Sequence, residues 1–248
     1  GKNVKFTASR INLKNMLRDV QNYLKDKPKK LDWNKLNLNN LAHRLVIKNE
    51  SKYLTGEIEH WQQELNPAKD HFNRRITLQA PITQAGAWLL SAEMADGNEC
   101  HTILWLNNSV IVQKKLDNKS LYIFTDAISG KPLANTKVDF FGYRQKYFPK
   151  SVPRKYEIYT KNIERTTDAN GQIILTQAEV TDDKGSYNWL ISSGDDKHFV
   201  FKGFEGIYPH KAYTRNSKNF RTYIITDRPV YQPGQKVEIK AWSAKVSY

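Results

Sequence analysis

The sequence predicts a mostly β protein, made of tandem antiparallel β-sandwich modules with an N-terminal helix. From residue 41 onward, short apolar or alternating runs are separated by turn residues about every 8 to 15 positions, which favours sandwiches over a parallel sheet with crossover helices. A chain of 248 residues suits two modules of about 100 residues each, with a remainder. One helical stripe of apolar residues stands near the start.

Residues 1–30 combine a strand with this helix. Val4, Phe6 and Ala8 alternate with polar residues, as in a half-buried strand. Asn12 is a suitable N-cap, and Pro28 prevents the helix from continuing. The residues that form one apolar face at helical spacing are Leu13, Met16, Leu17, Val20 and Leu24. We expect a helix that covers a sheet.

Residues 1–108 are expected to form the first sandwich module. Its predicted strands are Leu41–Ile47, Glu57–Leu65, Arg75–Gln79, Ala87–Met94 and His101–Leu106. Asp96-Gly97 stands between the last two strands and predicts a type I′ hairpin turn, which needs positive φ at both central residues.

Residues 109–214 are expected to form a second sandwich. Its predicted strands are Val110–Val112, Leu121–Phe124, Lys137–Gly142, Ile173–Leu175, Tyr187–Ser192 and His198–Phe204, with a polar, proline-bearing insertion at 144–155. The basic segment 209–218 has no apolar period and is typical of a linker.

Residues 215–248 are expected to be the truncated start of a third domain, with strands at Phe220–Ile225 and Lys236–Trp242. Because two strands cannot close a sandwich, we expect this end to pack against the second module or against another copy of the chain.

The connection between these two strands carries the most specific motif. It contains Thr226, Asp227, Arg228, Pro229, Tyr231, Pro233 and Gly234. Two prolines cannot donate to a central ladder, so the segment should leave the sheet as a rigid corner, with Gly234 at the turn and Asp227 accepting backbone hydrogen bonds. This pattern resembles the segment that opens a macroglobulin domain in proteins of the alpha-2-macroglobulin family.

Three further segments resemble strand pairs of bacterial members of that family. They are Phe124–Val138, Thr167–Ile173 and Ala80–Leu90. The resemblance implies macroglobulin-like, immunoglobulin-like sandwiches that form a non-catalytic scaffold fragment. It also implies a parent protein that inhibits endopeptidases by trapping them, with proteases and the parent's other domains as partners, a periplasmic, cell-envelope or extracellular location, and a role in host defence.

The sequence departs from the family's reactive thioester, written Cys-x-Glu-Gln, because Cys100 is followed by His101-Thr102-Ile103. The strand pairs also occur in other extracellular sandwich repeats. The alternative interpretation is therefore a carbohydrate-binding or adhesive β-sandwich array.

Nothing in the sequence predicts an enzyme, a metal site or a cofactor. Cys100 is the single cysteine, its strand neighbours point the other way, and the six histidines include no helical His-x-x-x-His pair. The pairs Asp182-Asp183 and Asp195-Asp196 are interpreted as solvated turns. No glycine-rich phosphate loop is present.

The net charge of +14 is distributed along the whole chain. It predicts a solvated basic surface with weak, salt-sensitive binding to nucleic acid and no sequence-specific nucleic-acid site. No run approaches the roughly 20 apolar residues of a transmembrane segment.

Overall fold

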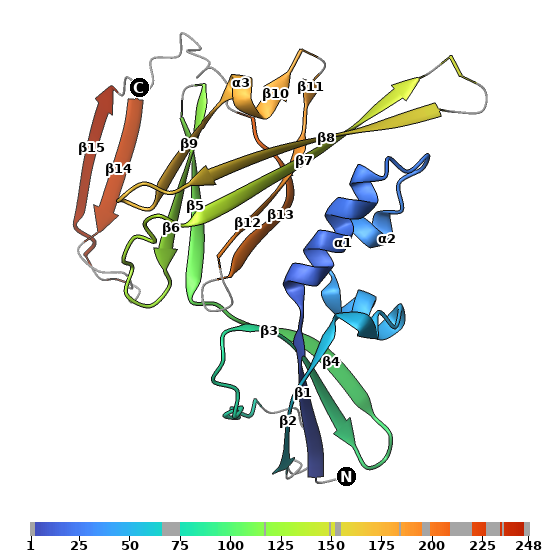
Figure 1. The fold of residues 1–248 in the computed structure, drawn as a ribbon. Helices are drawn as coiled ribbons and strands as arrows, with labels where there is room; N and C mark the ends of the chain where they lie inside the picture. The colour runs from blue at the N-terminus through green and yellow to red at the C-terminus, as the bar shows by residue number, and fades with distance from the viewer. Residues whose placement is uncertain are drawn as a thin grey trace.

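The computed structural model describes residues 3–65, 75–116, 118–148, 150–151, 155–183, 185–194, 199–208, 220–226, 234 and 236–245. The prediction of a mostly antiparallel β protein with an N-terminal helix is confirmed (Figure 1). None of the helices within these ranges combines the length and apolar character that crossing a bilayer requires.

The first sheet contains four antiparallel strands in the order β2-β1-β3-β4. Their bounds are Asn3–Ile11 for β1, Leu54–Glu64 for β2, Gly86–Met94 for β3 and Glu99–Leu106 for β4. No second sheet faces it among the described residues up to Leu106, so this module differs from the expected sandwich. The predicted strand at 75–79 is irregular chain.

The β3–β4 hairpin closes differently from the prediction. The Gly97 N–H donates to the Met94 carbonyl over 3.0 Å, and Gly97 has φ +87°, whereas Asp96 does not have positive φ. This is a three-residue loop in which a tight turn is followed by one left-handed glycine. A type I′ turn is therefore not formed, although the hairpin itself is confirmed.

A helical segment follows β1. It comprises α1 (Leu13–Lys25), α2 (Trp33–Leu36), a π-helical turn His43–Ile47 and a 3₁₀ turn Ser51–Tyr53. Asn12 caps α1 through its side chain, and all five residues of the predicted apolar stripe are buried. The predicted strand Leu41–Ile47 is wrong: Leu41 and Leu45 are both buried four residues apart, which is the spacing of a helix and not of a strand.

The second module is a sandwich, as predicted. One sheet has the order β13-β12-β7-β8 and the other β5-β6-β9. Their bounds are Ser109–Leu116 (β5), Lys119–Asp126 (β6), Lys137–Phe148 (β7), Lys155–Thr166 (β8), Gln172–Thr176 (β9), Asn188–Ser193 (β12) and Val200–Gly206 (β13). The short α3 (Gln177–Val180), β10 (Thr181–Asp182) and β11 (Gly185–Ser186) connect β9 to β12.

Side chains of both sheets fill the sandwich core. Tyr122 and Phe124 come from β6, Phe140 from β7 and Trp189 from β12, and all four are fully buried. The alternation of strand residues accounts for this core, because neighbours of these residues point to the opposite face of each sheet.

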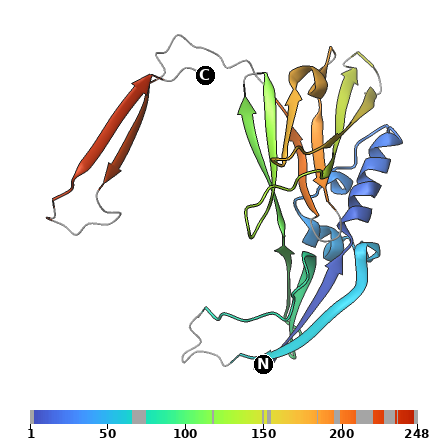
Figure 2. The ribbon, with the colours of Figure 1, turned by 60° about the vertical axis from the view of Figure 1, so that its left-hand side comes forward.

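On the outer face of the β13-β12-β7-β8 sheet, a second core joins the helical segment to the sandwich. Phe141, Tyr143, Ile158 and Leu190 of this sheet lie in the same buried cluster as the α1 stripe. Figures 1 and 2 both show α1 lying along this sheet. One core thus includes residues from both sides of position 108, and the boundaries at 108 and 214 stay predictions of the sequence.

The last described strands, β14 (Phe220–Thr226) and β15 (Ile239–Lys245), form an antiparallel hairpin. Figure 2 shows this hairpin apart from the sandwich. Ile224 and Ile239 are 65% and 64% exposed. In the described residues the hairpin therefore does not have the packing against the second module that the sequence led us to expect.

Candidate functional site

The single cysteine lies on an exposed strand of the first sheet. Cys100 is free and exposed, while His101 points to the other face and its Nδ1 lies 2.8 Å from the Ser91 hydroxyl. Glu99 shares the His101 face, with 3.4 Å between its carboxylate and His101 Nε2. The alternation therefore separates the thiol from the imidazole, as the sequence predicted.

Potential metal ligands are dispersed. Among the described residues, no three His, Cys, Asp or Glu side chains lie close enough to hold an ion. His60 and His101 lie on the outermost strands of the first sheet, and two strands stand between them. Each histidine instead forms a hydrogen bond to the neighbouring strand. His60 Nδ1 lies 3.2 Å from the Thr7 hydroxyl, and His101 bonds to Ser91 as described above.

Asp182 is not the solvated turn residue that the sequence suggested. Its Oδ2 accepts a hydrogen bond from the Tyr187 hydroxyl over 2.8 Å and lies 3.5 Å from an Arg144 guanidinium nitrogen. The Arg144 side chain is only 8% exposed, and its guanidinium lies 4.2 Å from the Tyr159 ring centre. Burial is the main cause that raises the pKa of Tyr187. The cluster has a structural role, because it neutralises a buried arginine at the edge of the sandwich.

Asp195-Asp196 lies outside the described residues. Most of the motif between β14 and β15 does too: Asp227, Arg228, Pro229, Tyr231 and Pro233, and with them the expected Asp227 cap.

Two motif residues are described. Thr226 ends β14 opposite Ile239 of β15. Gly234 has φ +83°, the left-handed conformation expected for the glycine of this turn. The motif thus connects two strands that pair with each other.

The two other family-like segments of the second module meet at one end of the sandwich. The Thr167 hydroxyl donates to the Leu133 carbonyl over 2.6 Å and accepts from the Thr136 N–H over 2.9 Å. The Phe124 N–H donates to the Gly171 carbonyl over 2.8 Å. Thr167 is 2% exposed. This arrangement is a buried corner that fixes strand connections.

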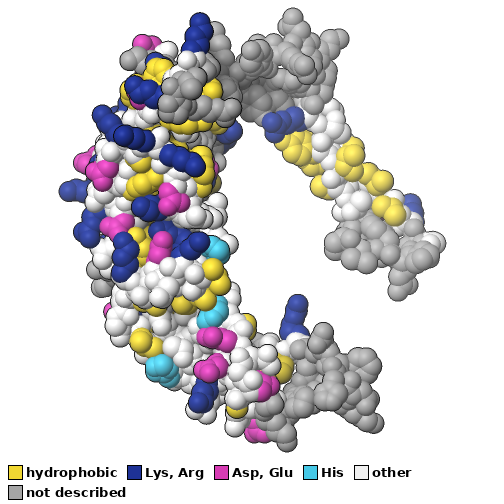
Figure 3. All heavy atoms as spheres, turned by 90° about the vertical axis from the view of Figure 1, so that its right-hand side faces the viewer, with side chains coloured by type: hydrophobic (Ala, Val, Ile, Leu, Met, Phe, Trp, Pro, Cys, Tyr) yellow, Lys and Arg dark blue, Asp and Glu magenta, His cyan; other side chains and the backbone are white. Residues whose placement is uncertain are grey.

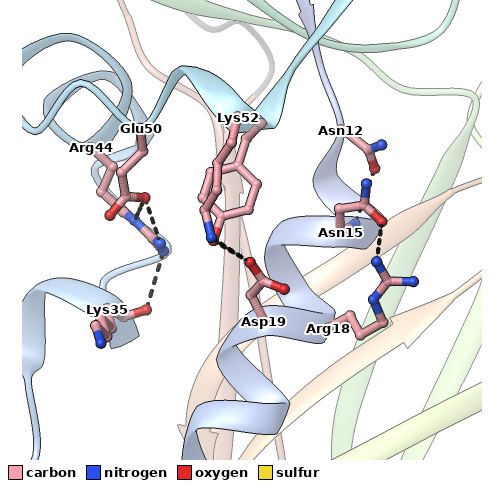
Figure 4. Close-up of polar contacts among 9 residues, drawn as sticks. Asn12, Asn15, Arg18, Asp19, Lys35, Arg44, Glu50 and Lys52 are labelled. Atoms are coloured by element: carbon pink, nitrogen blue, oxygen red, sulfur yellow. Dashed lines mark hydrogen bonds and ion pairs between the residues drawn. The ribbon is translucent and has the colours of Figure 1, made fainter.

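Two groups of polar contacts connect the turns of the helical segment to one another (Figure 4). Asp19 Oδ2 accepts from Lys52 Nζ over 2.7 Å and from the Tyr53 hydroxyl over 2.9 Å. The hydrogen bond from Lys52 is the main cause that lowers the pKa of Asp19. Arg44, whose side chain is 3% exposed, donates from Nε to Glu50 over 2.9 Å and from Nη1 to the Lys35 carbonyl over 3.1 Å.

Three surface cavities gather where the first sheet, α1 and the sandwich meet. Cavities of about 610, 200 and 250 Å³ share Phe199 as a lining residue, and the largest is lined by Lys14, Asp139 and Glu164 among others. Asp139 accepts a hydrogen bond from the Gln21 side chain of α1 over 3.2 Å, and burial raises its pKa. These features mark an interface between parts of the chain.

Charge is spread over the visible surface. In Figure 3, Lys and Arg side chains are most frequent on the upper part, acidic side chains occur on both the upper and the lower part, and the visible His side chains lie toward the lower part. Sequence reasoning missed the buried Arg144 and the half-buried Asp139, although both stand in runs of strand-forming residues where the alternation could have marked their orientation.

No protein-family model and no curated protein matches the sequence. The fold is similar to two crystal structures of native alpha-2-macroglobulin from Escherichia coli. The one spanning domains MG0-NIE-MG1 has 15% identity and a TM-score of 0.49, over 82% of this chain and 55% of that chain. The one spanning NIE-MG1 has 16% identity and a TM-score of 0.47, over 82% and 84%. This chain thus spans about half the length of the first structure.

Proposed function

We propose that this chain is a non-catalytic scaffold piece of an alpha-2-macroglobulin-like protein, whose full-length parent inhibits endopeptidases by trapping them in the periplasm, at the cell envelope or outside the cell. The observation that carries the proposal is the motif from Thr226 to Gly234, which connects the paired strands β14 and β15. The buried corner formed by Thr167 and Leu133 supports it, because both belong to segments that resemble the same family.

A scaffold must hold its parts in a fixed arrangement. The core shared by α1, Phe141 and Leu190 meets this requirement, because buried apolar contacts between two parts of a chain disfavour their relative motion. The Asp19–Lys52 and Arg44–Glu50 pairs add polar contacts with defined geometry.

The test compares the 248-residue chain with the full-length parent against a panel of endopeptidases. We expect the chain alone to leave every protease active and to form no adduct, and the parent to retain cleaved protease and to block large substrates while small substrates are still hydrolysed. Stoichiometric inhibition by the chain alone, or a parent that traps no protease, would contradict the proposal. Fractionation of cells that express the parent tests its location.

A second candidate function is carbohydrate binding. Trp33 is 64% exposed at a cavity of about 340 Å³ that Tyr143, Phe204 and Asn37 also line. An exposed indole beside amide side chains suits a sugar ring, which has an apolar face and polar edges. A glycan array with the wild type and with Trp33→Ala tests this. Binding that disappears in the variant would favour an adhesive array over the trapping scaffold.

A further inference from the structure

The segment predicted as an insertion at 144–155 forms a projecting ribbon. β12 pairs with β7 only from Val138 to Tyr143, while β7 and β8 continue to pair from Arg144↔Tyr159 to Phe148↔Lys155. Five residue pairs extend about 17 Å beyond the sheet. Figures 1 and 2 show this ribbon leaving the sandwich near the C-terminal end of α1. We define the projection as the described residues 144–148, 150–151 and 155–159.

A two-stranded ribbon is marginal in water unless side chains stabilise it. At its base, the buried Arg144 is held by Asp182 and Tyr159. Near its tip, the Ser151 hydroxyl donates to the Phe148 carbonyl over 2.8 Å and accepts from the Lys155 N–H over 2.7 Å. The projection therefore has defined structure at both ends.

The projection is basic and aromatic. Its exposed basic side chains among the described residues are Lys146, Lys150 and Lys155, and its one acidic side chain, Glu157, lies 3.5 Å from Lys155. Tyr147 is 44% exposed and packs against Tyr156 across the strands, with ring centres 5.3 Å apart and the rings tilted by 33°. The C-terminal end of α1, which Figures 1 and 2 show on the side of the sheet from which the ribbon projects, carries and is followed by further exposed lysines (Lys25, Lys27, Lys29 and Lys30).

Lysines on an unpaired strand edge also protect against aggregation, and this function would explain Lys146 alone. It does not explain why Tyr147 and Phe148 stand at the tip among lysines. Tyrosine and lysine both combine an apolar body with a polar end, which is the character that favours the interface of a bilayer. Anionic headgroups attract such a basic cluster over about a Debye length.

The ring geometry argues against nucleic acid. Bases stack on free aromatic faces. Here the Tyr147 and Tyr156 rings contact each other at an interplanar angle of 33°, and the Phe148 ring is approached by Lys146 at 4.8 Å and by Lys155 at 5.6 Å. The projection is an extended two-stranded ribbon, whereas a bound peptide is usually held in a groove. We propose that the projection docks the chain on an anionic phospholipid surface.

The test is vesicle co-sedimentation of the 248-residue chain with phosphatidylcholine vesicles that contain or lack about one third phosphatidylglycerol, at about 0.1 M salt. We expect binding to the anionic vesicles only. Lys146→Glu with Lys155→Glu should weaken it at least about tenfold, and Tyr147→Ser should weaken it several-fold without a change of net charge. The matched control is Lys114→Glu with Lys115→Glu on β5, which changes the net charge equally and should weaken binding by less than about threefold.

The proposal is overturned if anionic vesicles are not bound, if the β5 control loses as much binding as the ribbon variant, or if a DNA duplex is bound as tightly as the vesicles. Thermal unfolding of each variant verifies that the sandwich is intact. If Lys146→Glu with Lys155→Glu is unfolded, Lys146→Ser with Tyr147→Ser in the folded protein gives the same comparison.

Discussion

The backbone N–H of Phe124 in β6 donates to the carbonyl oxygen of Gly171 over 2.8 Å, and this contact brings two chain segments 47 positions apart into close approach. A Cβ at Gly171 would clash with the Phe124 carbonyl oxygen and lie 3.1 Å from the Leu133 nitrogen. Gly171 also has φ +70°. The position therefore requires glycine for its backbone conformation and for space.

Gly171→Ala and Gly130→Ala separate these two requirements. Gly130 has nearly the same φ, +69°, but no atom lies within 4 Å of its Cβ position. We expect Gly130→Ala to reduce the free energy of unfolding by about 1 kcal/mol from backbone strain, and Gly171→Ala to reduce it by at least about 2 kcal/mol more. Urea unfolding measures both. Equal losses would show that the buried corner can relax around a methyl group.

Asp19→Asn tests the contact between α1 and the turn at Ser51–Tyr53. Because hydrogen bonding to Lys52 lowers the pKa of Asp19, this carboxylate stabilises the fold at pH values above the ordinary carboxyl pKa, and the contribution is lost as the pH falls through the lowered pKa. The Asp19 side chain is 40% exposed, so we expect a loss of about 1 kcal/mol at pH 7. Urea unfolding at pH 7 and at about pH 3 should give a smaller difference between variant and wild type at the acid pH. Asp26→Asn, at the exposed end of α1, is the control; a similar loss there would contradict the specific contact.

Asp139→Asn is expected to increase the free energy of unfolding, whereas Asp19→Asn is expected to reduce it. Burial raises the pKa of Asp139, so the ionised side chain costs stability, and this cost appears as the pH rises through the raised pKa. Asparagine keeps an acceptor for the Gln21 side chain and removes the charge. We expect the variant to gain on the order of 1 kcal/mol at pH 7 and to gain nothing near pH 4. Glu164→Gln, an exposed carboxylate on the neighbouring strand, should change stability by less than about 0.5 kcal/mol. A loss of stability in Asp139→Asn would mean that the charge itself forms a stabilising interaction.

Local sequence patterns predicted the helices and strands in which apolar residues recur at a regular spacing. The apolar stripe from Leu13 to Leu24 predicted α1 with its Asn12 cap, and the alternation of apolar and polar residues predicted most strands of the sandwich. The run Leu41–Ile47 was misinterpreted because a short apolar run has the same composition in a buried strand and in a helical turn. Charged residues and prolines made residues 144–155 look like an insertion, which hid the second half of β7. No strand was predicted at β8, although Tyr156, Ile158 and Thr160 do alternate.

How the helices and strands pack together was harder to predict from the sequence than the helices and strands themselves. No local pattern indicates that α1 shares a core with Phe141 and Leu190, because this contact depends on tertiary packing between segments more than 100 residues apart. The same holds for the buried Arg144, whose partners Asp182 and Tyr187 lie far along the chain. The motif that suggested the family could be found because its prolines and glycine constrain the backbone directly.

The exposed hairpin of β14 and β15 leads to the last prediction, that the chain self-associates through it. Tyr223 and Trp242 stack across the strands and are 51% and 47% exposed, and Ile224 and Ile225 are 65% and 52% exposed. An apolar two-stranded unit with free edges recruits other strands. We expect light scattering to show a concentration-dependent dimer for the full chain and a monomer after deletion of residues 218–248. Ile224→Lys should weaken the dimer at least about tenfold, because pairing would bury the added charge. Ile128→Lys, at an 86% exposed position in a turn of the sandwich, is the matched control and should leave the dimer unchanged. If the full chain is monomeric at all concentrations, the exposed apolar strands do not drive association.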